Sequence, residues 1–353
     1  MTLAARISRL GGKNVKNAGE YFGRCSTATG WSSAAVMSGP NCTFVGRRTW
    51  HHTALLVGSC ARNVRHSLEQ HAKDWLTLVL DMVAASRSDG LGAAAIIFDD
   101  AQRTGDPDGT RAALLSWAAQ DNRIRLLLAH PLLYPRWSRT QRLALCRNMI
   151  AHEAARLPGN SVFLALDLDC QTPPASELLP RLGSFVPLLK PPASAASAAE
   201  AELQWDALTA NTRAASYYYD RWALRSRAIT LDYDCWFNRT QRSARGACPE
   251  YAITIDPAAP SLAVDSAFNG LGLYRANAMR VALAANCRYR GTKNSYLCEH
   301  VPFHLCMRQQ DLNIGVVPSL AVDCGATAVA PLPKRVAVQA DGSVSVVSAS
   351  RCR

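Results

Sequence analysis

The chain has no apolar run that approaches the length of about 18 residues needed to cross a bilayer, so no transmembrane segment is expected. It has 12 cysteines but no Cys-x-x-Cys pair, which disfavours a structural zinc site and favours scattered buried thiols with some disulfides. Basic residues form no dense stripe interleaved with aromatic ones, and this argues against nucleic acid as a partner. What is present is the composition of a globular protein, with 48% hydrophobic and 19% charged residues among 353.

Acidic residues are nearly missing from residues 1–50, where Glu20 stands against seven lysines and arginines. This segment therefore carries half of the net charge of +12. Such a composition predicts a basic, disordered tail or a targeting segment that resembles an organelle transit peptide. Peripheral contact with an anionic membrane surface is a minor alternative. The composition leaves open whether the protein is cytoplasmic or organellar.

Apolar runs alternate with amphipathic stretches along most of the chain. Strands are predicted over 54–60, 93–98, 124–128, 162–169 and 314–318. Helices are predicted over 68–83, 111–120 and 142–155, with Thr110 capping the second. This order predicts an α/β fold in which helices cover both faces of a parallel sheet. We expect one domain over 51–325, followed by a loosely attached tail over 326–353.

Two carboxylates, Asp167 and Asp169, close the apolar run over 162–169. The proline-containing segment 170–174 follows and cannot continue a strand. Acids at the carboxyl end of a buried strand lie where open α/β sheets bind ligands, and carboxylates buried there need a cation or water. We hypothesise that this Asp-x-Asp holds a hard divalent cation against the diphosphate of a nucleotide sugar. The alternative interpretation is a solvated turn after a strand.

A second acidic pair, Asp99 and Asp100, ends the predicted strand over 93–98. Because the carboxyl ends of parallel strands share one edge of a sheet, this pair can converge with Asp167 and Asp169 on one crevice. A helix cap or a turn is the alternative role for Asp99 and Asp100.

Aromatic residues beside charged partners gather in the second half of the chain. The candidates are Trp205, Asp206, Tyr219, Asp220 and Trp222. Aromatic faces stack on sugar rings and carboxylates accept hydrogen bonds from sugar hydroxyls, so this composition suits a sugar site. The alternative is a pair of strands packed in the core.

Two further segments carry candidate residues. Gly270 and Gly272 would allow the backbone to approach a ligand closely. A proline suited to a first helical turn places Glu299 and His300 just before a helix and His304 in its first turn. A side chain at such a rigid position is well suited to act as a base, while capping and a surface histidine are the alternative.

Eight short stretches together resemble a glycosyltransferase family of the GT-A fold, the capsule-associated α-1,3-mannosyltransferase-like proteins, which also occur in large algal viruses. The stretches are 58–64, 98–110, 142–148, 166–169, 205–211, 218–225, 264–275 and 298–304. The resemblance implies a GT-A-like, Rossmann-like and mostly parallel sheet with a small acceptor-side β region. It also implies a nucleotide-binding half over 51–170 and an acceptor half over 200–325.

The resemblance implies donor-side roles. The nucleotide pocket would be lined by Gly58, Ser59 and Cys60. Asp99 or Asp100 would contact the nucleoside, and the base or ribose would be contacted by Arg147 or Asn148. Mn²⁺ or Mg²⁺, and with it the donor diphosphate, would be held by Asp167 and Asp169. His300 or His304 could complete the metal or phosphate shell.

The resemblance implies acceptor-side roles as well. Glu299 would match the acidic position of the base in inverting members, and Asp265 is a second catalytic candidate. An acceptor loop would contain Gly270 and Gly272, with Asn269 standing where the family usually has a glycine.

These features predict a metal-dependent glycosyltransferase that moves a sugar from a nucleoside-diphosphate sugar to a hydroxyl of a glycan or similar acceptor. One alternative is a catalytically inactive, transferase-like carbohydrate-binding protein. A less favoured alternative is a haloacid-dehalogenase-type phosphatase, because that motif needs Thr or Val two residues after its second Asp, where Gln171 stands.

Overall fold

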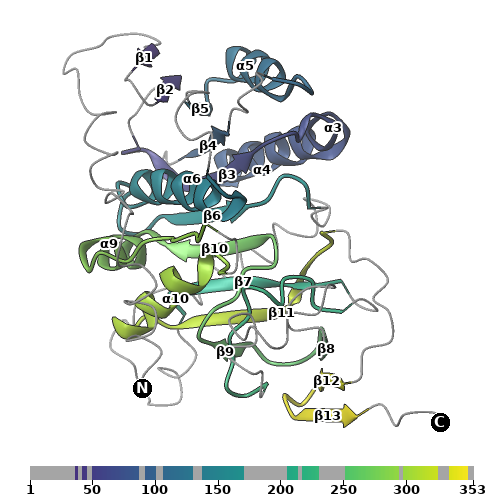
Figure 1. The fold of residues 1–353 in the computed structure, drawn as a ribbon. Coiled ribbons are helices and arrows are strands. Elements are labelled where there is room, and N and C mark those ends of the chain that lie inside the picture. The colour runs from purple at the N-terminus through teal and green to yellow at the C-terminus, as the bar shows by residue number, and fades with distance from the viewer. Residues whose placement is uncertain are drawn as a thin grey trace.

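The computed structural model describes residues 36–38, 42–45, 50–86, 92–100, 106–129, 137–170, 205–213, 217–229, 251–293, 297–324 and 334–348. Residues 1–35 of the predicted basic tail and Gln171 lie outside these ranges. Figure 1 shows the described elements as ribbons.

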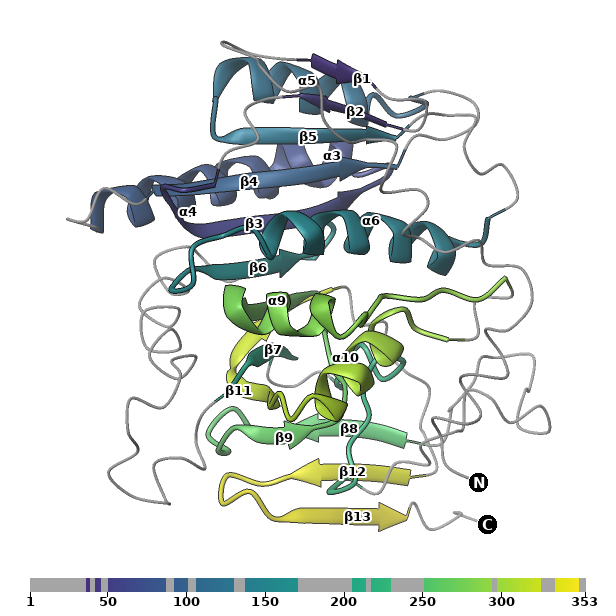
Figure 2. The same cartoon turned by 90° about the vertical axis from the view of Figure 1, so that its left-hand side faces the viewer.

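A ten-stranded sheet runs through the molecule (Figures 1 and 2). Its strands, in spatial order, are β1 (Val36–Ser38), β2 (Cys42–Val45), β5 (Ile124–Ala129), β4 (Gly92–Asp99), β3 (Thr53–Ala61), β6 (Val162–Leu166), β10 (Leu271–Arg275), β7 (Ala207–Thr212), β11 (Ile314–Val322) and β9 (Leu262–Val264). The run β5-β4-β3-β6 is parallel, as predicted. Beyond β6 the sheet is mixed: β10 is antiparallel to both neighbours, and β7 is parallel to β11.

Helices cover both faces of the parallel run, which confirms the α/β class. One face carries α3 (Arg65–Ser67), the π-helical turn η1 (Leu68–Ala72), α4 (Lys73–Ser86) and α5 (Thr110–Gln120). The other face carries α6 (Arg139–Ala154). Successive side chains of β3 point to opposite faces of the sheet. Val57 packs in the cluster with α4 and α5, and Leu56 packs in the cluster with α6. A strand buried on both faces is mostly apolar, and in this one Thr53 and Ser59 are the hydroxyl-bearing exceptions.

Helix ends differ from the predictions for local reasons. Helix α6 begins at Arg139 instead of residue 142, because Ser138 and Gln141 form a capping box. Thr110 does not cap α5. Its hydroxyl accepts hydrogen bonds from the backbone N–H groups of Val64 (2.9 Å) and Arg65 (3.1 Å), so it caps the start of α3.

The predicted tail boundary at residue 50 is wrong. Strand β2 pairs with β5, and β1 pairs with β2, so the sheet already includes residues Val36–Ser38 and Cys42–Val45. Trp50 is buried, and its indole N–H donates to the Glu153 carboxylate of α6 at 2.9 Å. The guanidinium of Arg125 lies 3.8 Å from the centre of the Trp50 ring. The domain therefore begins before residue 51.

The C-terminal segment is also more structured than predicted. A second, three-stranded sheet has the order β13 (Val344–Ser348), β12 (Lys334–Val338), β8 (Tyr251–Ile255). Val336 and Val338 are buried, so 334–348 is part of the core and not a loose tail. The missed signal was Asp341-Gly342, a turn pair between two valine-rich runs, with Gly342 at φ +81°.

Within the described ranges, three disulfides link separate elements of the fold. They are Cys60–Cys146 between β3 and α6, Cys170–Cys324 between the end of β6 and the end of β11, and Cys287–Cys306 between the segment after α9 (Ala276–Ala284) and α10 (His300–Gln309). Cys298, which is buried, is free.

Candidate active site

The Asp-x-Asp segment forms a turn where β6 ends. The backbone N–H of Asp167 donates to the carbonyl of Gly270 at 2.8 Å, and that of Cys170 donates back to the carbonyl of Asp167 at 3.2 Å. Leu168 is buried, whereas Asp169 is exposed and the Asp167 side chain is 28% exposed. The turn thus anchors its apolar middle residue and presents both carboxylates at the edge of the sheet.

Arg147 of α6 connects this turn to the second half of the chain. Its Nη2 donates to Asp167 Oδ1 at 3.1 Å, and its Nε donates to Glu299 Oε1 at 2.9 Å. The side chains of Arg147 and Glu299 are 7% and 3% exposed. Burial alone would lower the pKa of Arg147, but the charges of Asp167 and Glu299 raise it above its ordinary value. The guanidinium therefore stays charged and compensates two carboxylates at once.

A stack of rings supports the guanidinium of Arg147. It lies 4.5 Å from the centre of the Phe268 ring, which stacks on the His300 ring at 3.9 Å. Tyr289 meets His300 edge-on and stacks on Phe303 at 4.1 Å. His300 is buried, and burial followed by the charge of Arg147 lowers its pKa well below the ordinary value. It is thus a neutral supporting ring.

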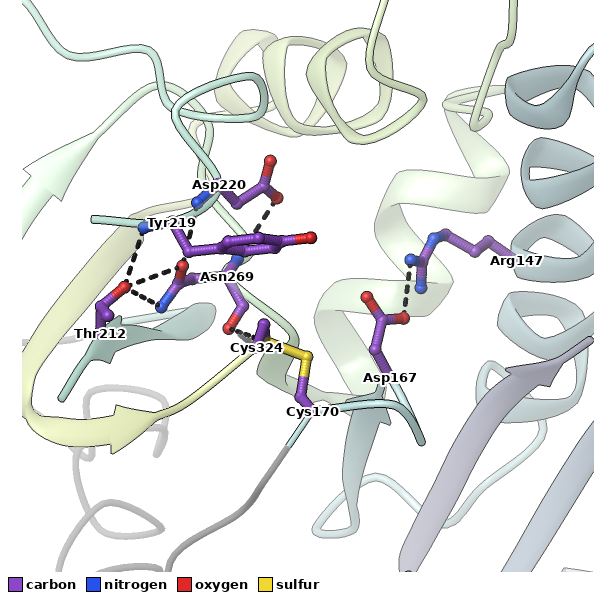
Figure 3. The surroundings of a disulfide bond; sticks show 8 residues. All are labelled: Arg147, Asp167, Cys170, Thr212, Tyr219, Asp220, Asn269 and Cys324. Atoms are coloured by element: carbon purple, nitrogen blue, oxygen red, sulfur yellow. Dashed lines mark hydrogen bonds and ion pairs between the residues drawn. A yellow bond between two sulfur atoms is a disulfide. The ribbon is translucent and has the colours of Figure 1, made fainter. Parts of the chain in front are cut away.

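Across from Arg147, hydrogen bonds hold the segment that carries Asp220 (Figure 3). Thr212, at the end of β7, accepts from Asn269 Nδ2 at 3.1 Å and from the N–H of Tyr219 at 2.9 Å. Asn269 Oδ1 accepts from the N–H of Asp220 at 3.1 Å. The Asp220 carboxylate accepts from the N–H groups of Ala223 (3.1 Å) and Asn269 (3.4 Å). The Tyr219 ring extends from this network toward Asp167.

The lack of a side chain at Gly270 leaves room for the Cys170–Cys324 disulfide next to the Asp-x-Asp turn. The φ of this glycine is +82°, and a Cβ there would lie 2.5 Å from the sulfur atoms of both Cys170 and Cys324. Asn269, one residue earlier, also has positive φ, at 55°. Asparagine tolerates this conformation far better than most residues, which explains how it can stand where the resembling family has a glycine.

Carboxylates crowd this edge of the sheet. Burial, followed by the charge of Asp167, raises the pKa of Asp169, whose carboxylate lies among protein atoms although the residue as a whole is exposed. Burial raises the pKa of Asp220 to about 6; the N–H groups of Ala223 and Asn269 act to lower it, and the charges of Glu299 and Asp167 act to raise it. Raised carboxylate pKa values in one cluster are typical of functional sites.

The structure brings together predicted residues from both halves of the chain. They are Arg147, Asp167, Asp169, Tyr219, Asp220, Asn269, Gly270, Glu299 and His300. Thr212 and Phe268 complete the cluster and were not predicted. No local signal marks Thr212, because it reaches this edge only through the pairing of β7 with β10 and of β10 with β6.

The residues predicted to line a nucleotide pocket have other contacts. Gly58 leaves room for Ile150 and Phe163, and Cys60 is bonded to Cys146. Ser59 is buried on the opposite face of β3.

Asn148 was predicted to contact the base or ribose. Its side chain instead exchanges two hydrogen bonds with the backbone of Tyr289, at 2.8 and 2.9 Å. The amide is thereby paired on both its oxygen and its nitrogen.

Arginines neutralise the second acidic pair. Asp99 pairs with Arg111, and Asp100 pairs with Arg142 at 2.9 Å and Arg62 at 3.6 Å. Burial raises the pKa of Asp100 to about 6, although Arg62 lowers it. The predicted contact of this pair with a nucleoside stays a prediction.

Trp205 and Asp206 lie at the opposite edge of the sheet from Asp167. They precede β7, whose first residue pairs through β10 with the beginning of β6. Trp205 packs over Gly315, and Asp206 accepts from the N–H of Asn313 at 2.8 Å. These contacts are those of the core interpretation, and not of a sugar site beside Asp167.

The remaining candidates also have structural contacts. Gly272 lies within β10, where a Cβ would come 3.0 Å from the Tyr274 ring. The carbonyl of Trp222, a partly buried residue, accepts from the guanidinium of Arg225 at 2.9 Å.

Two candidates for chemistry are engaged elsewhere. Asp265 lies 3.7 Å from Arg227 and 3.8 Å from Arg308. His304 is fully buried, with Nε2 2.9 Å from the Tyr274 hydroxyl and Nδ1 3.3 Å from the Ser266 hydroxyl. With both ring nitrogens hydrogen-bonded, His304 has no lone pair directed at Asp167 and Asp169 for a shared metal.

Comparison with known proteins finds distant similarity to solved structures alone. No family model matches the chain, and no curated protein matches it in sequence. Among solved structures, apo mouse xyloside xylosyltransferase 1 is similar over 77% of this chain and 83% of its own, with a TM-score of 0.28 and 12% sequence identity. At that TM-score the similarity assigns neither family nor activity. None of the described helices is long and apolar enough to span a membrane.

Proposed function

We propose that the protein is a metal-dependent glycosyltransferase that uses a nucleoside-diphosphate sugar and a hydroxyl acceptor, as its resemblance to the mannosyltransferase-like GT-A family implies. The observation that carries this proposal is the meeting of Asp167 and Asp169 with acidic residues of the second half. Arg147 forms ion pairs with both Asp167 and Glu299. Asp220 lies close enough to Asp167 and Glu299 for their negative charges to act to raise its pKa. A parallel-sheet half that ends in an acid pair would hold the donor, and the second half would hold the acceptor.

The donor atoms at the turn fit a hard divalent cation. Carboxylate oxygens of Asp167 and Asp169 and the sulfur of Cys170 lie within 4.8 Å of one another. Because Cys170 is bonded to Cys324, its sulfur is not available as a thiolate, and only oxygen ligands remain. Two carboxylates with space for phosphate and water oxygens suit Mn²⁺ or Mg²⁺ better than Zn²⁺. A bound ion would supply Lewis-acid neutralisation of the departing diphosphate.

The neighbouring side chains suit a sugar. The Tyr219 side chain extends toward Asp167, and the residue is 51% exposed, which leaves its ring free to stack on a pyranose face. Its pKa is raised by partial burial and then by Asp220, Asp169 and Asp167, so the ring lies within the acidic cluster. Donor and acceptor sugars would thus be held between the Asp-x-Asp turn and the Tyr219–Asp220 segment.

A donor screen tests this proposal. Hydrolysis and binding of a panel of nucleoside-diphosphate sugars would be measured with Mn²⁺ and with a chelator, for the wild type and for Asp169→Ala. We expect turnover of at least one donor, lost with chelator and reduced at least about 100-fold by Asp169→Ala, because charge stabilisation at a leaving group contributes on that scale. Asp256→Asn is the matched control, since Asp256 directly follows β8 and accepts from the N–H of Ala258 in a turn, a bond that Asn keeps.

Two results would count against the transferase. Donor binding without turnover, insensitive to chelator, would support the inactive carbohydrate-binding protein. Phosphate trapped covalently on Asp167 would support the phosphatase, because in a transferase that residue is never a nucleophile.

A further inference from the structure

Arg147 occupies a ligand of the proposed metal site (Figure 3). Its Nη2 donates to Asp167 Oδ1 at 3.1 Å, and the Asp167 side chain is 28% exposed whereas that of Arg147 is 7% exposed. The guanidinium therefore reaches this carboxylate from the interior. Burial and then the charge of Asp167 raise the pKa of Asp169, whereas Arg147 acts to lower it, so the charge of Arg147 reaches both proposed metal ligands.

The guanidinium of Arg147 is fixed in this place. Its Nε donates to Glu299 Oε1 at 2.9 Å, and its plane lies 4.5 Å from the centre of the Phe268 ring, which stacks on His300 at 3.9 Å. The Glu299 side chain is 3% exposed, and its Oε2 lies 3.9 Å from the Cys298 thiol. Glu299, predicted from the sequence as a base, is thus engaged by Arg147 and acts as a positioning residue for it.

Arg147 has donor capacity beyond these two bonds. A guanidinium carries five N–H groups, and within the described part of the chain the hydrogen bonds from Arg147 are those to Glu299 and Asp167. The planar arrangement of these N–H groups matches the oxygens of a phosphate as well as those of a carboxylate. A phosphate group at the Asp-x-Asp turn would therefore compete with Asp167 for the same guanidinium.

We propose that Arg147 changes partner when the donor binds: Asp167 turns from Arg147 to the divalent cation, and the freed N–H groups of Arg147 bind the donor diphosphate. This inference rests on the proposed transferase function and names a residue that binds its substrate. A cation alone would break the Arg147–Asp167 bond and place two positive charges side by side. A diphosphate alone would find the guanidinium occupied. Arg147 therefore makes the binding of the cation and of the diphosphate depend on each other.

The contact with Asp167 assigns Arg147 to the phosphates of the donor and not to its base or ribose. The diphosphate is the part of the donor that a cation on Asp167 and Asp169 would hold, and Arg147 is already within hydrogen-bond distance of Asp167. A nucleoside diphosphate leaves with additional negative charge whether the configuration of the sugar is retained or inverted. A fixed guanidinium at this place would stabilise that charge in either case.

Two variants of the turn test the exchange, Asp167→Asn and the matched control Asp169→Asn. Each removes one negative charge from the same turn, but only Asp167 pairs with Arg147. Inorganic pyrophosphate is titrated into each protein by calorimetry with a chelator present. We expect Asp167→Asn to tighten pyrophosphate binding about tenfold or more, because it frees a charge-assisted donor. Asp169→Asn should tighten it no more than about threefold, as expected for an exposed charge.

The double variant Arg147→Lys/Asp167→Asn tests whether the gain passes through the guanidinium. One ammonium group cannot bond to Glu299 and grip a phosphate as the planar guanidinium does, so the tenfold gain should disappear. Uridine and guanosine, which carry no phosphate, should bind equally to the wild type and to Asp167→Asn. Thermal unfolding establishes that each variant is folded under the conditions of the titration.

Three results would overturn the exchange of partners: equal gains for Asp167→Asn and Asp169→Asn, no gain for Asp167→Asn, or a gain that persists in the double variant. If the wild type still turns over a nucleotide sugar with Mn²⁺, such a result leaves the proposed function standing. A wild type that binds neither Mn²⁺ nor any nucleotide sugar overturns the proposed function, and this inference with it.

Discussion

At the scale of single residues, Arg147 connects the two halves of the candidate site. It is a buried cation between two carboxylates, one from each half of the chain. Removing one partner of a buried ion pair costs far more than the pair contributes, because the remaining charges stay desolvated and unpaired. Arg147 therefore contributes to stability and to the geometry of the site together.

Arg147→Met tests this role. The variant leaves Asp167 and Glu299 without a cation, and we expect the free energy of unfolding in urea to fall by about 3–5 kcal/mol. Arg147→Lys keeps the charge, but a single ammonium group cannot donate to both carboxylates as the planar guanidinium does. The decrease in unfolding free energy should therefore be intermediate. Arg65→Met breaks the exposed pair with Glu69 and should leave the unfolding free energy almost unchanged. Equal losses for Arg147 and Arg65 would contradict this view of the site.

Gly270→Ala makes a second prediction at this scale. Positive φ and the two sulfur atoms at 2.5 Å both oppose a methyl group, so we expect a loss of more than about 1 kcal/mol in unfolding free energy. Mn²⁺ affinity should fall as well, because the Gly270 carbonyl anchors the N–H of Asp167. Gly92→Ala is the control: a Cβ there meets only the His52 carbonyl at 3.9 Å, and φ is not positive. A tolerated Gly270→Ala would mean that the disulfide can move.

At the scale of elements, cross-links fix the parts that carry site residues. Cys146 precedes Arg147 in α6, Cys170 follows Asp169, and Cys306 belongs to α10, which begins beside Glu299. Each disulfide thus cross-links a segment that also carries a residue of the candidate site: Arg147, Asp169 or Glu299. Coupling of this kind limits the movement of loops that would otherwise be free at the edge of a sheet.

Removal of the Cys170–Cys324 disulfide should loosen the Asp-x-Asp turn. In the double variant Cys170→Ser/Cys324→Ser we expect a lower melting temperature, from a loss of about 2–4 kcal/mol, and weaker Mn²⁺ binding. In Cys287→Ser/Cys306→Ser we expect a comparable loss of stability with Mn²⁺ affinity retained, because that cross-link lies away from the turn. The comparison is made by calorimetry and thermal unfolding. Unchanged metal affinity in the first variant would show that the turn holds its shape without the disulfide.

At the scale of the whole molecule, buried acids and buried histidines have opposite effects on how the free energy of unfolding depends on pH. The pKa of Asp100 is raised to about 6 by burial, so the folded protein binds a proton there that the unfolded chain, with a value of 3.8, does not. The pKa of His304 is lowered to about 3 by burial and by Arg147, so the unfolded chain, with a value of 6.5, binds a proton that the folded protein refuses. Asp220 behaves like Asp100 and His300 like His304.

These signs predict a shallow net pH dependence between about pH 6 and pH 4. As pH falls through this range, Asp100 and Asp220 stabilise the folded state while His300 and His304 destabilise it. Asp100→Asn should make the unfolding free energy fall with decreasing pH, and His304→Gln should make it rise, each by up to about 1.4 kcal/mol per pH unit. The slope in urea unfolding is the readout. Identical slopes in the two variants would show that these groups do not titrate as inferred.

The three disulfides also bear on where the molecule folds. Disulfides form and persist in oxidising compartments and are rare in the cytosol. We therefore expect the correctly folded chain to be recovered from an oxidising environment in higher yield than from a reducing one.

The sequence by itself determined the parallel half of the fold and the acid pair at the end of β6. Apolar runs of strand length, such as 54–60 and 162–166, allow little other than buried strands, and an amphipathic helix follows the first of them. Asp167 and Asp169 end such a run, so their place at the edge of the sheet follows from local pattern alone. The hairpin at Asp341-Gly342 could also have been predicted from its local sequence, but it was not.

Only the tertiary structure decided which partners these acids meet. Arg147, Thr212 and Asp220 come together through pairing of β10 with β6 and β7, at separations of tens of residues that no local periodicity encodes. The same non-local packing took Trp205 and Asp206 to the opposite edge and enclosed Glu299 behind Arg147. Burial and charge compensation depend on neighbours in space, which is why the sequence could name candidate acids but not the partners that surround them.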